Sequence, residues 1–274
     1  MVASVVFGSG ASSAADLPAR IYKKAPLMMD RVYDWSGFYA GVNAGYAFDG
    51  RARDAITPND PTTLGGITGG FVPTSVSNRS DGFTGGGQIG YNYQFHNNPA
   101  GGVVIGIEAD AAYMDLSRTS DTVTGRGFDT QLHSRLDFLG TVRGRLGYAF
   151  DRLLVYGTGG LAYGEVNDRM TNFNRVGVSG YTGSQDAMRT GYAYGGGIEY
   201  ALASNSALNV FQTNGMTVKV EYLHYDLGTN SFLSNAVAGV GAAGTSFTNS
   251  VRIDGDLVRA GLNYKFSGPA AGKY

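Results

Sequence analysis

Residues 258–266 read VRAGLNYKF, a stretch in which apolar and polar side chains alternate without interruption. The apolar positions are Val258, Ala260, Leu262, Tyr264 and Phe266, and the positions between them are Arg259, Gly261, Asn263 and Lys265. Side chains that alternate with period two point to opposite faces of an extended backbone. The stretch therefore predicts a β-strand with one apolar and one polar face.

Seven further stretches show the same alternation or a strand-like apolar run. They cover residues 38–48, 83–95, 103–113, 136–148, 153–164, 192–200 and 216–222. In residues 153–164 both alternating positions carry apolar groups, so the two faces of that strand are not assigned by the pattern. Together with residues 258–266, these stretches predict eight strands.

The connections between the predicted strands alternate in length. Long polar connections cover residues 49–82, 115–133, 165–189 and 227–256, whereas residues 96–102 and 149–152 form short ones and residues 203–215 an intermediate one. Long connections on one side and short ones on the other are typical of an up-and-down transmembrane barrel. The sequence predicts an all-β, eight-stranded antiparallel barrel with long extracellular loops.

The polar face of these strands carries charges of nearly balanced sign. Its candidate members are Glu108, Asp110, Arg143, Arg145, Glu199, Lys219, Glu221 and Arg259, with Lys265 at the end of the last strand. An arginine or lysine at the lipid midplane costs about 2–4 kcal/mol, so a membrane barrel would turn this face inward. We then expect a network of ion pairs in the lumen rather than a selective channel. In a soluble barrel the faces would be reversed, and a secreted soluble β-barrel that binds an apolar ligand is the alternative.

Aromatic residues gather near the ends of the predicted strands. In a membrane barrel such residues would form a girdle at the membrane–water boundary, although aromatic residues also favour strands in general. The predicted girdle consists of Phe38, Tyr46, Phe48, Tyr91, Tyr93, Phe95, Tyr148, Tyr200, Tyr264 and Phe266.

The two ends of the chain differ from the predicted barrel at residues 36–266. Residues 1–15 are small or apolar and end in Ser13-Ala14-Ala15, which is typical of a secretory signal peptide and its cleavage site. The alternative is that these residues form a disordered N-terminal tail. No lysine or arginine precedes the apolar part, so we expect this signal peptide to be truncated. Residues 16–35 would form a periplasmic segment and residues 267–274 a C-terminal tail.

Composition excludes several classes of protein. The chain has 274 residues with 43 glycines, 16% charged residues, a net charge of −1 and no cysteine. Glycine without a three-residue period excludes collagen, the absence of cysteine excludes disulfide scaffolds and thiolate sites, and the charge gives no indication of nucleic-acid binding. The glycine-rich residues 85–90 and 157–162 lie in predicted strands, and His96, His133 and His224 lack metal-site spacing. We expect no enzyme activity, no catalytic, cofactor or metal site, and no cofactor.

Several short motifs together resemble a known family. They are residues 33–41 (YDWSGFYAG), 106–110 (GIEAD), 142–148 (VRGRLGY), 220–222 (VEY) and 264–266 (YKF). They resemble the small outer-membrane β-barrels of alphaproteobacteria, which are porin-like or opacity-like surface antigens.

The resemblance covers about residues 35–266 and implies an integral outer-membrane protein of a Gram-negative bacterium. Its role would be structural or in surface interaction, with at most small-solute permeability. The implied partners are outer-membrane lipid and lipopolysaccharide, the barrel-assembly machinery through the C-terminal strand, and an unknown surface partner, but no nucleic acid. One departure is that eight residues follow Phe266, whereas family members commonly end on the aromatic residue of the last strand.

Overall fold

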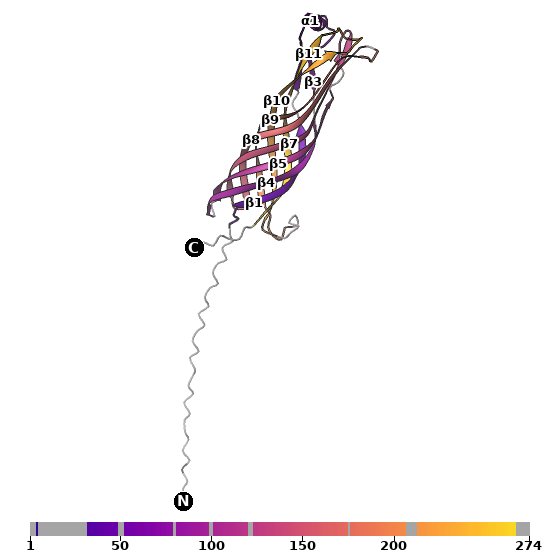
Figure 1. Ribbon diagram of the computed structural model, residues 1–274. Coiled ribbons are helices and arrows are strands. Elements are labelled where there is room, and N and C mark those ends of the chain that lie inside the picture. The colour runs from indigo at the N-terminus through magenta and orange to yellow at the C-terminus, as the bar shows by residue number, and fades with distance from the viewer. Residues whose placement is uncertain are drawn as a thin grey trace. The chain divides into compact units, whose positions relative to one another are not determined.

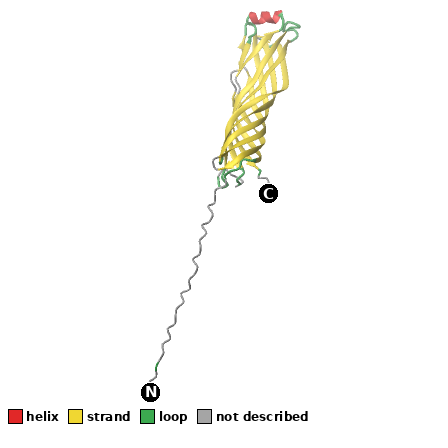
Figure 2. Cartoon of the chain, turned by 90° about the vertical axis from the view of Figure 1, so that its left-hand side faces the viewer, coloured by secondary structure: helices red, strands yellow, loops and turns green. Residues whose placement is uncertain are grey.

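Eight long strands form a closed antiparallel ring in the computed structural model (Figures 1 and 2). The structure describes residue 4 and residues 32–48, 52–78, 81–98, 101–119, 123–174, 176–206 and 213–266. The ring consists of β1 (Gly37–Phe48), β4 (Asp81–Asn98), β5 (Gly101–Thr119), β7 (Phe128–Phe150), β8 (Leu153–Asn174), β9 (Ser179–Ala201), β10 (Met216–Ala236) and β11 (Ser246–Lys265). Each strand pairs with the next, and β11 pairs with β1 to close the ring. The predicted eight-stranded up-and-down barrel is confirmed.

The strands continue far into the stretches that the sequence suggested to be loops. β7 and β9 have 23 residues each and β8 has 22, whereas a tilted strand needs about 9–11 residues to cross a bilayer. The extra length lies in the predicted loops: most of residues 115–133, 165–189 and 227–256 belongs to strands. These stretches are rich in Gly, Thr and Asn, but at positions such as Val166 and Met170 on β8 they keep apolar side chains that face inward.

The connection from β1 to β4 also has regular structure. It contains β2 (Ala52–Pro58), α1 (Pro61–Thr68) and β3 (Ser75–Asn78), and β2 pairs with β11. α1 lies at the upper end of the barrel as drawn in Figure 1. Asp60 accepts hydrogen bonds from the backbone N–H groups of Thr63 and Thr62, and this hydrogen bonding holds the pKa of the Asp60 carboxyl below its usual value. The two-residue β6 (Val123–Thr124) pairs with β7.

Two irregularities change which side chains face the interior. On β7 the register shifts between Leu136 and Phe138, so that Leu136 is buried inside although its spacing from Val142 suggested the outer face. On β10 the register shifts between Asp226 and Thr229, where Gly228 has a φ of +79° that glycine adopts without strain. Above each shift, the alternation of inward and outward side chains is displaced by one residue from the alternation below it.

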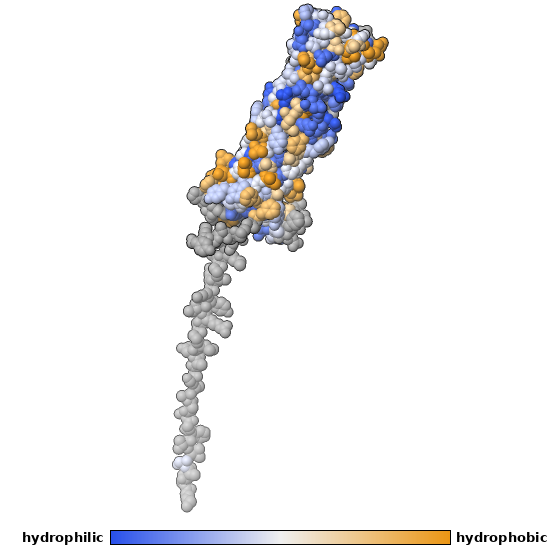
Figure 3. All heavy atoms as spheres, viewed as in Figure 1, coloured by the Kyte–Doolittle hydropathy of each residue, from blue (hydrophilic) through white to orange (hydrophobic). Residues whose placement is uncertain are grey.

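The inner and outer faces exchange polarity along the barrel. In the lower half the outer face carries apolar groups such as Val42 and Leu262, and the interior carries charges. In the upper half most buried side chains are apolar, with some buried polar ones such as Asp168 and Asn230, and the outer face is mostly polar. Figure 3 shows hydrophobic residues over the lower part of the visible face and hydrophilic ones above them. Among the described residues, no helix is long and apolar enough to cross a membrane.

Residues 1–31, apart from Ser4, and residues 267–274 lie outside the described residues. The signal peptide, most of the N-terminal segment and the C-terminal tail therefore remain predictions.

Candidate functional site

Eight charged side chains meet inside the lower half of the barrel. We call them the central charge cluster, which consists of Glu108, Asp110, Arg143, Arg145, Glu199, Lys219, Glu221 and Arg259. None of them is more than 5% exposed. The cluster has four acids and four bases, so its formal charges cancel. The structure thus brings together all eight residues that the alternation pattern grouped on one face, whereas Lys265 lies apart at the lower end of the barrel, with its ammonium group 4.6 Å from the centre of the Tyr33 ring.

Ion pairs in the cluster reach across the lumen from one wall to the other. Lys219 on β10 donates to both carboxylate oxygens of Glu108 on β5, each at 2.9 Å. Arg259 on β11 donates to both oxygens of Asp110 on β5, each at 3.0 Å. Arg143 on β7, the strand next to β5, joins the two acids by donating to Glu108 at 2.7 Å and to Asp110 at 2.8 Å. Because strands on opposite sides of the ring are joined directly, the side chains themselves fill this layer.

Glu221 and Glu199 complete the pairing of the cluster. Arg259 donates through Nε to Glu221 at 2.8 Å, and Arg143 Nη1 lies 3.3 Å from the same carboxylate. Arg145 donates to Glu199 at 2.7 Å. Buried charges are tolerated only when they are paired and hydrogen-bonded, and each of the eight charges has such a partner here.

Uncharged polar side chains surround the cluster, and sequence reasoning did not assign them to the network. Tyr39 donates to Glu108 at 2.8 Å, and Tyr156 donates to Glu221 at 3.0 Å. The guanidinium of Arg145 lies over the Tyr156 ring at 3.9 Å from its centre. Thr141 donates to Asp110 at 2.6 Å and Asn263 donates to Glu199 at 2.8 Å. Tyr39, Thr141 and Asn263 share the inward alternation of the charges, and that signal could have identified them.

A second layer closes the lower end of the barrel. We call it the lower apolar cap; it consists of Tyr33, Trp35, Val104, Ala149, Leu154, Tyr156 and Ala201. Trp35 is 2% exposed, and its ring packs against that of Tyr33 at a centroid distance of 5.0 Å. The Trp35 indole N–H donates to the carbonyl oxygen of Asp151, in the turn between β7 and β8, at 2.9 Å. The backbone N–H of Trp35 donates to Gln94 at 2.9 Å. The segment before β1 is therefore held against the barrel.

A third layer fills the interior of the upper half. We call it the upper apolar core. Its buried residues are Ala47, Ile56, Val72, Val76, Met114, Leu116, Leu132, Leu136, Leu139, Ala162, Val166, Met170, Tyr181, Ala193, Leu223, Tyr225, Leu227, Phe232, Phe247, Val251, Ile253 and Leu257. Asp168 lies buried in the same region and accepts hydrogen bonds from Ser134 and Asn230. The interior thus resembles the core of a soluble protein at the level where the outer face is polar.

Aromatic rings form two bands on the outer face of the lower half. All ten residues of the predicted girdle are exposed there, from 36% for Tyr264 to 67% for Phe38. By strand register, Tyr46 and Phe48 belong to the upper band, at the upper boundary of the apolar outer face. The other eight belong to the lower band, toward the lower end of the barrel. The upper band has further members that sequence reasoning omitted: Phe83, Tyr113, Phe138, Tyr163, Tyr192, Tyr194 and Tyr222.

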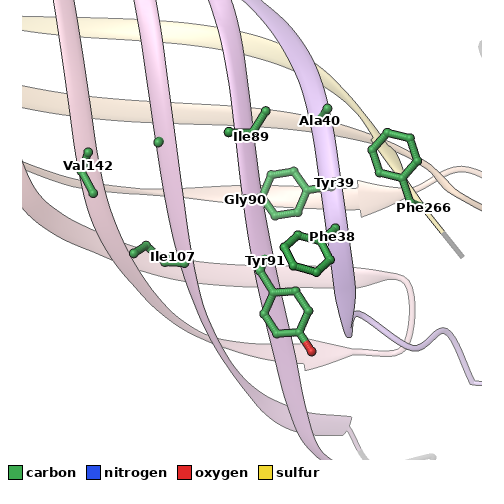
Figure 4. A pocket seen from close by; sticks show the side chains of 10 residues that line it. Phe38, Tyr39, Ala40, Ile89, Gly90, Tyr91, Ile107, Val142 and Phe266 are labelled. Carbon is green, nitrogen blue, oxygen red and sulfur yellow. The ribbon is translucent and has the colours of Figure 1, made fainter. Parts of the chain in front are cut away.

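Between the two bands the outer face is apolar and hollowed in places. Figure 4 shows one groove, of about 410 Å³, near the lower band, with Phe38, Tyr91 and Phe266 beside it and Ile89, Ile107 and Val142 along it. An apolar groove on an apolar outer face fits contact with lipid chains. Apart from the Tyr91 hydroxyl at its edge, the side chains named here offer no polar group with which to fix a specific ligand.

The residues considered for catalysis or metal binding do not converge. His224 lies 2.9 Å from Asp256 on the outer face, and His133 lies on the outer face of β7. Within the described ranges, no three His, Asp or Glu side chains are grouped as metal ligands would be. The glycine-rich residues 85–90 and 157–162 lie inside β4 and β8.

Comparison with known proteins finds similarity in sequence and in fold. A family model described as "Outer membrane protein beta-barrel domain" matches residues 2–266. The 31 kDa outer-membrane immunogenic protein of Brucella melitensis is 36% identical over 236 residues, which cover 85% of each chain. A 22 kDa outer membrane protein of Rhizobium leguminosarum is 33% identical over 54% of this chain and 58% of its own. The crystal structure of the outer membrane protein OprG from Pseudomonas aeruginosa aligns with a TM-score of 0.52 over 87% of this chain and 99% of its own, at 12% identity, which shows a shared fold.

Proposed function

Because the chain belongs to the family of outer membrane protein β-barrel domains, we propose that it is a closed barrel that presents its upper half at the cell surface. Its location is the outer membrane. Its role is structural and in surface interaction, and solute passage is at most marginal.

The filled interior is the observation that carries this proposal. The lower apolar cap, the central charge cluster and the upper apolar core follow one another along the barrel axis. An eight-stranded barrel has an interior just wide enough for side chains to fill, whereas open aqueous channels occur in barrels of about 16–18 strands. The direct ion pair between Lys219 and Glu108 across the ring supports the same conclusion.

The exchange of polarity along the barrel supports the proposed surface position. An outer face that is apolar between two aromatic bands suits the bilayer, and a polar outer face over an apolar interior suits water. The exposed Val42, Ile89 and Leu262 argue against a secreted soluble barrel, which would leave them in water. We propose no enzymatic role, since the paired His224 and Asp256 lie on the outer face without a nucleophile assigned to them.

Assembly and surface contacts are further parts of the proposal. β11 pairs with β1 and closes the ring, so the barrel-assembly machinery would act on this C-terminal strand. The surface partner would meet the end of the barrel that carries α1 and the connection between β10 and β11. A relative is named an outer-membrane immunogenic protein, and exposure of this end to antibodies would follow from the proposal.

Solute passage through the reconstituted protein tests the closed interior. We expect liposomes that contain the protein to swell in disaccharide solution no faster than protein-free liposomes. The variant Glu108→Ala/Arg143→Ala/Trp35→Ala/Leu223→Ala removes large side chains from all three layers and should give small currents in a planar bilayer. The matched variant Arg135→Ala/Asp137→Ala, which changes an exposed pair on the outer face, should give none. Disaccharide-dependent swelling with the wild-type protein would contradict the proposal and favour a general porin.

A further inference from the structure

A polar groove lies on the outer face of β7, β8 and β9, above the upper aromatic band. We call it the outer polar groove; the residues that matter are His133, Arg135 and Asp137 on β7, Asn167 and Arg169 on β8, and Asp186 on β9. Phe138 and Tyr163 on the same strands belong to the aromatic band directly below, with ring centroids 5.9 Å apart. The groove therefore lies where the outer leaflet would end and its headgroups begin.

Strand register places two arginines side by side in this groove. Arg135 pairs with Asn167, and His133 pairs with Arg169, in the antiparallel ladder of β7 and β8. Arg135 and Arg169 are thus diagonal neighbours on one face, a relation in which backbones are about 7–8 Å apart and long side chains can reach a common ligand. Asn167 pairs in turn with Asp186 on β9, which places an acceptor on the far side of the groove.

The ion pairing in the groove leaves both arginines able to donate further hydrogen bonds. Asp137 lies 3.2 Å from Arg135 Nε and accepts a hydrogen bond from Asn167 at 3.2 Å, so its charge is already compensated. Arg169 is exposed and, within the part of the chain that the structure describes, forms no ion pair. The Arg135 side chain is 51% exposed, and its contact with Asp137 is made through Nε. The Nη groups of Arg135 and the guanidinium group of Arg169 can therefore donate to an anion.

We propose that the outer polar groove binds the phosphorylated sugar headgroup of lipopolysaccharide. A phosphate would lie between Arg135 and Arg169, because guanidinium groups donate pairs of hydrogen bonds to phosphate oxygens. Asn167 and Asp186 would hold sugar hydroxyls, and the acyl chains would run down over Phe138 and Tyr163. This order, with cations above aromatic rings on the same two strands, β7 and β8, matches an amphiphile that has its phosphate at the top of an apolar tail. A soluble sugar phosphate would contact only the polar groove and not the aromatic rings below it.

The proposal rests on the outer-membrane location and is independent of whether the barrel is closed. Its failure would therefore leave the conclusion about the interior unchanged, and a conducting barrel would leave this site unchanged.

Titration of a fluorescent bisphosphorylated lipid A into the purified protein in detergent micelles tests the site. We expect Arg135→Ala/Arg169→Ala to weaken binding about tenfold or more, since a hydrogen bond to a charged group contributes about one such factor. Arg135→Lys/Arg169→Lys keeps the charge and should recover part of the affinity. The matched control is Arg252→Ala, an exposed arginine of β11 that is paired with Asp226 at 2.6 Å, and it should bind as the wild type does. Heat-dependent gel mobility verifies that each variant is folded.

Two further ligands distinguish the sources of the phosphate. Dephosphorylated lipid A should bind at least tenfold more weakly than the bisphosphorylated form if the arginines hold a phosphate. Glucosamine 1-phosphate should compete only at far higher concentration, because it lacks acyl chains. Equal binding of both forms of lipid A, an equal loss with Arg252→Ala, or no measurable binding would overturn the proposal. Competition by glucosamine 1-phosphate at the affinity of lipid A would show a site for soluble sugar phosphates instead.

Discussion

Removing Glu108 and Lys219 one at a time and then together should show that the stability of the central charge cluster depends on equal numbers of acidic and basic side chains. Lys219 Nζ has one carboxylate within 4 Å among the described residues, that of Glu108. Glu108→Gln leaves three acids with four bases, and Lys219→Met leaves four acids with three bases. Leaving a buried charge without its partner costs about 3–5 kcal/mol, so we expect each single change to lower the free energy of unfolding by about that amount.

The double variant restores equal numbers of acids and bases. It should therefore cost less than the sum of the single changes, by an interaction energy of about 2–3 kcal/mol. Urea unfolding in phospholipid vesicles measures this, with the fluorescence of Trp35, the single tryptophan of the chain, as the signal. The same cycle on the exposed pair Arg135 and Asp137 should give about 0.2–1 kcal/mol. Additive costs for Glu108 and Lys219 would refute the view that charge balance stabilises the lumen.

Three further outcomes are expected. Leu262→Arg, between the aromatic bands, should lower the free energy of unfolding in vesicles by about 2–4 kcal/mol. Leu233→Arg, exposed on the upper half of β10, should leave this free energy nearly unchanged. Similar costs for the two variants would contradict the position proposed for the membrane. Leu223→Ala in the upper apolar core, where Leu223 is 1% exposed, should cost about 2–5 kcal/mol in the same measurement. Trp35→Phe removes the hydrogen bond to Asp151 and should cost about 0.5–1.5 kcal/mol beyond the change in packing, measured by thermal unfolding; no change would argue against the lower apolar cap.

The lower half of the barrel was predictable because each strand there keeps one alternation. Arg143 and Arg145 on β7 and Glu108 and Asp110 on β5 share the same inward positions, and the structure pairs Glu108 with Arg143 in the ladder between these strands. The ion pairs across the ring, such as Lys219 with Glu108, depend on the curvature of the closed barrel. Spacing along the chain carries no information on that curvature.

The upper half was not predictable for a different reason. Its outer face is in water, so inward apolar and outward polar positions replace the pattern that identified the lower strands, and the shifts at Asp137 and Gly228 move the alternation by one residue. Sequence reasoning consequently assigned these stretches to loops. The lower apolar cap was missed as well, because Tyr33 and Trp35 precede the first strand and their burial depends on a turn more than 100 residues later in the chain.

The pairing of β1 with β11 has a consequence for biogenesis. Tyr39 and Lys265 are register partners although they come from the first and last strands of the ring. Until the last strand is in place, β1 and β10 each present an edge with open backbone N–H and C=O groups, and lipid offers no hydrogen bonds to satisfy them. A chain released without β11 would therefore be excluded from the bilayer. Insertion should be all-or-none, and the step that joins the two ends of the ring should control its rate, since contacts between distant parts of a chain form slowly.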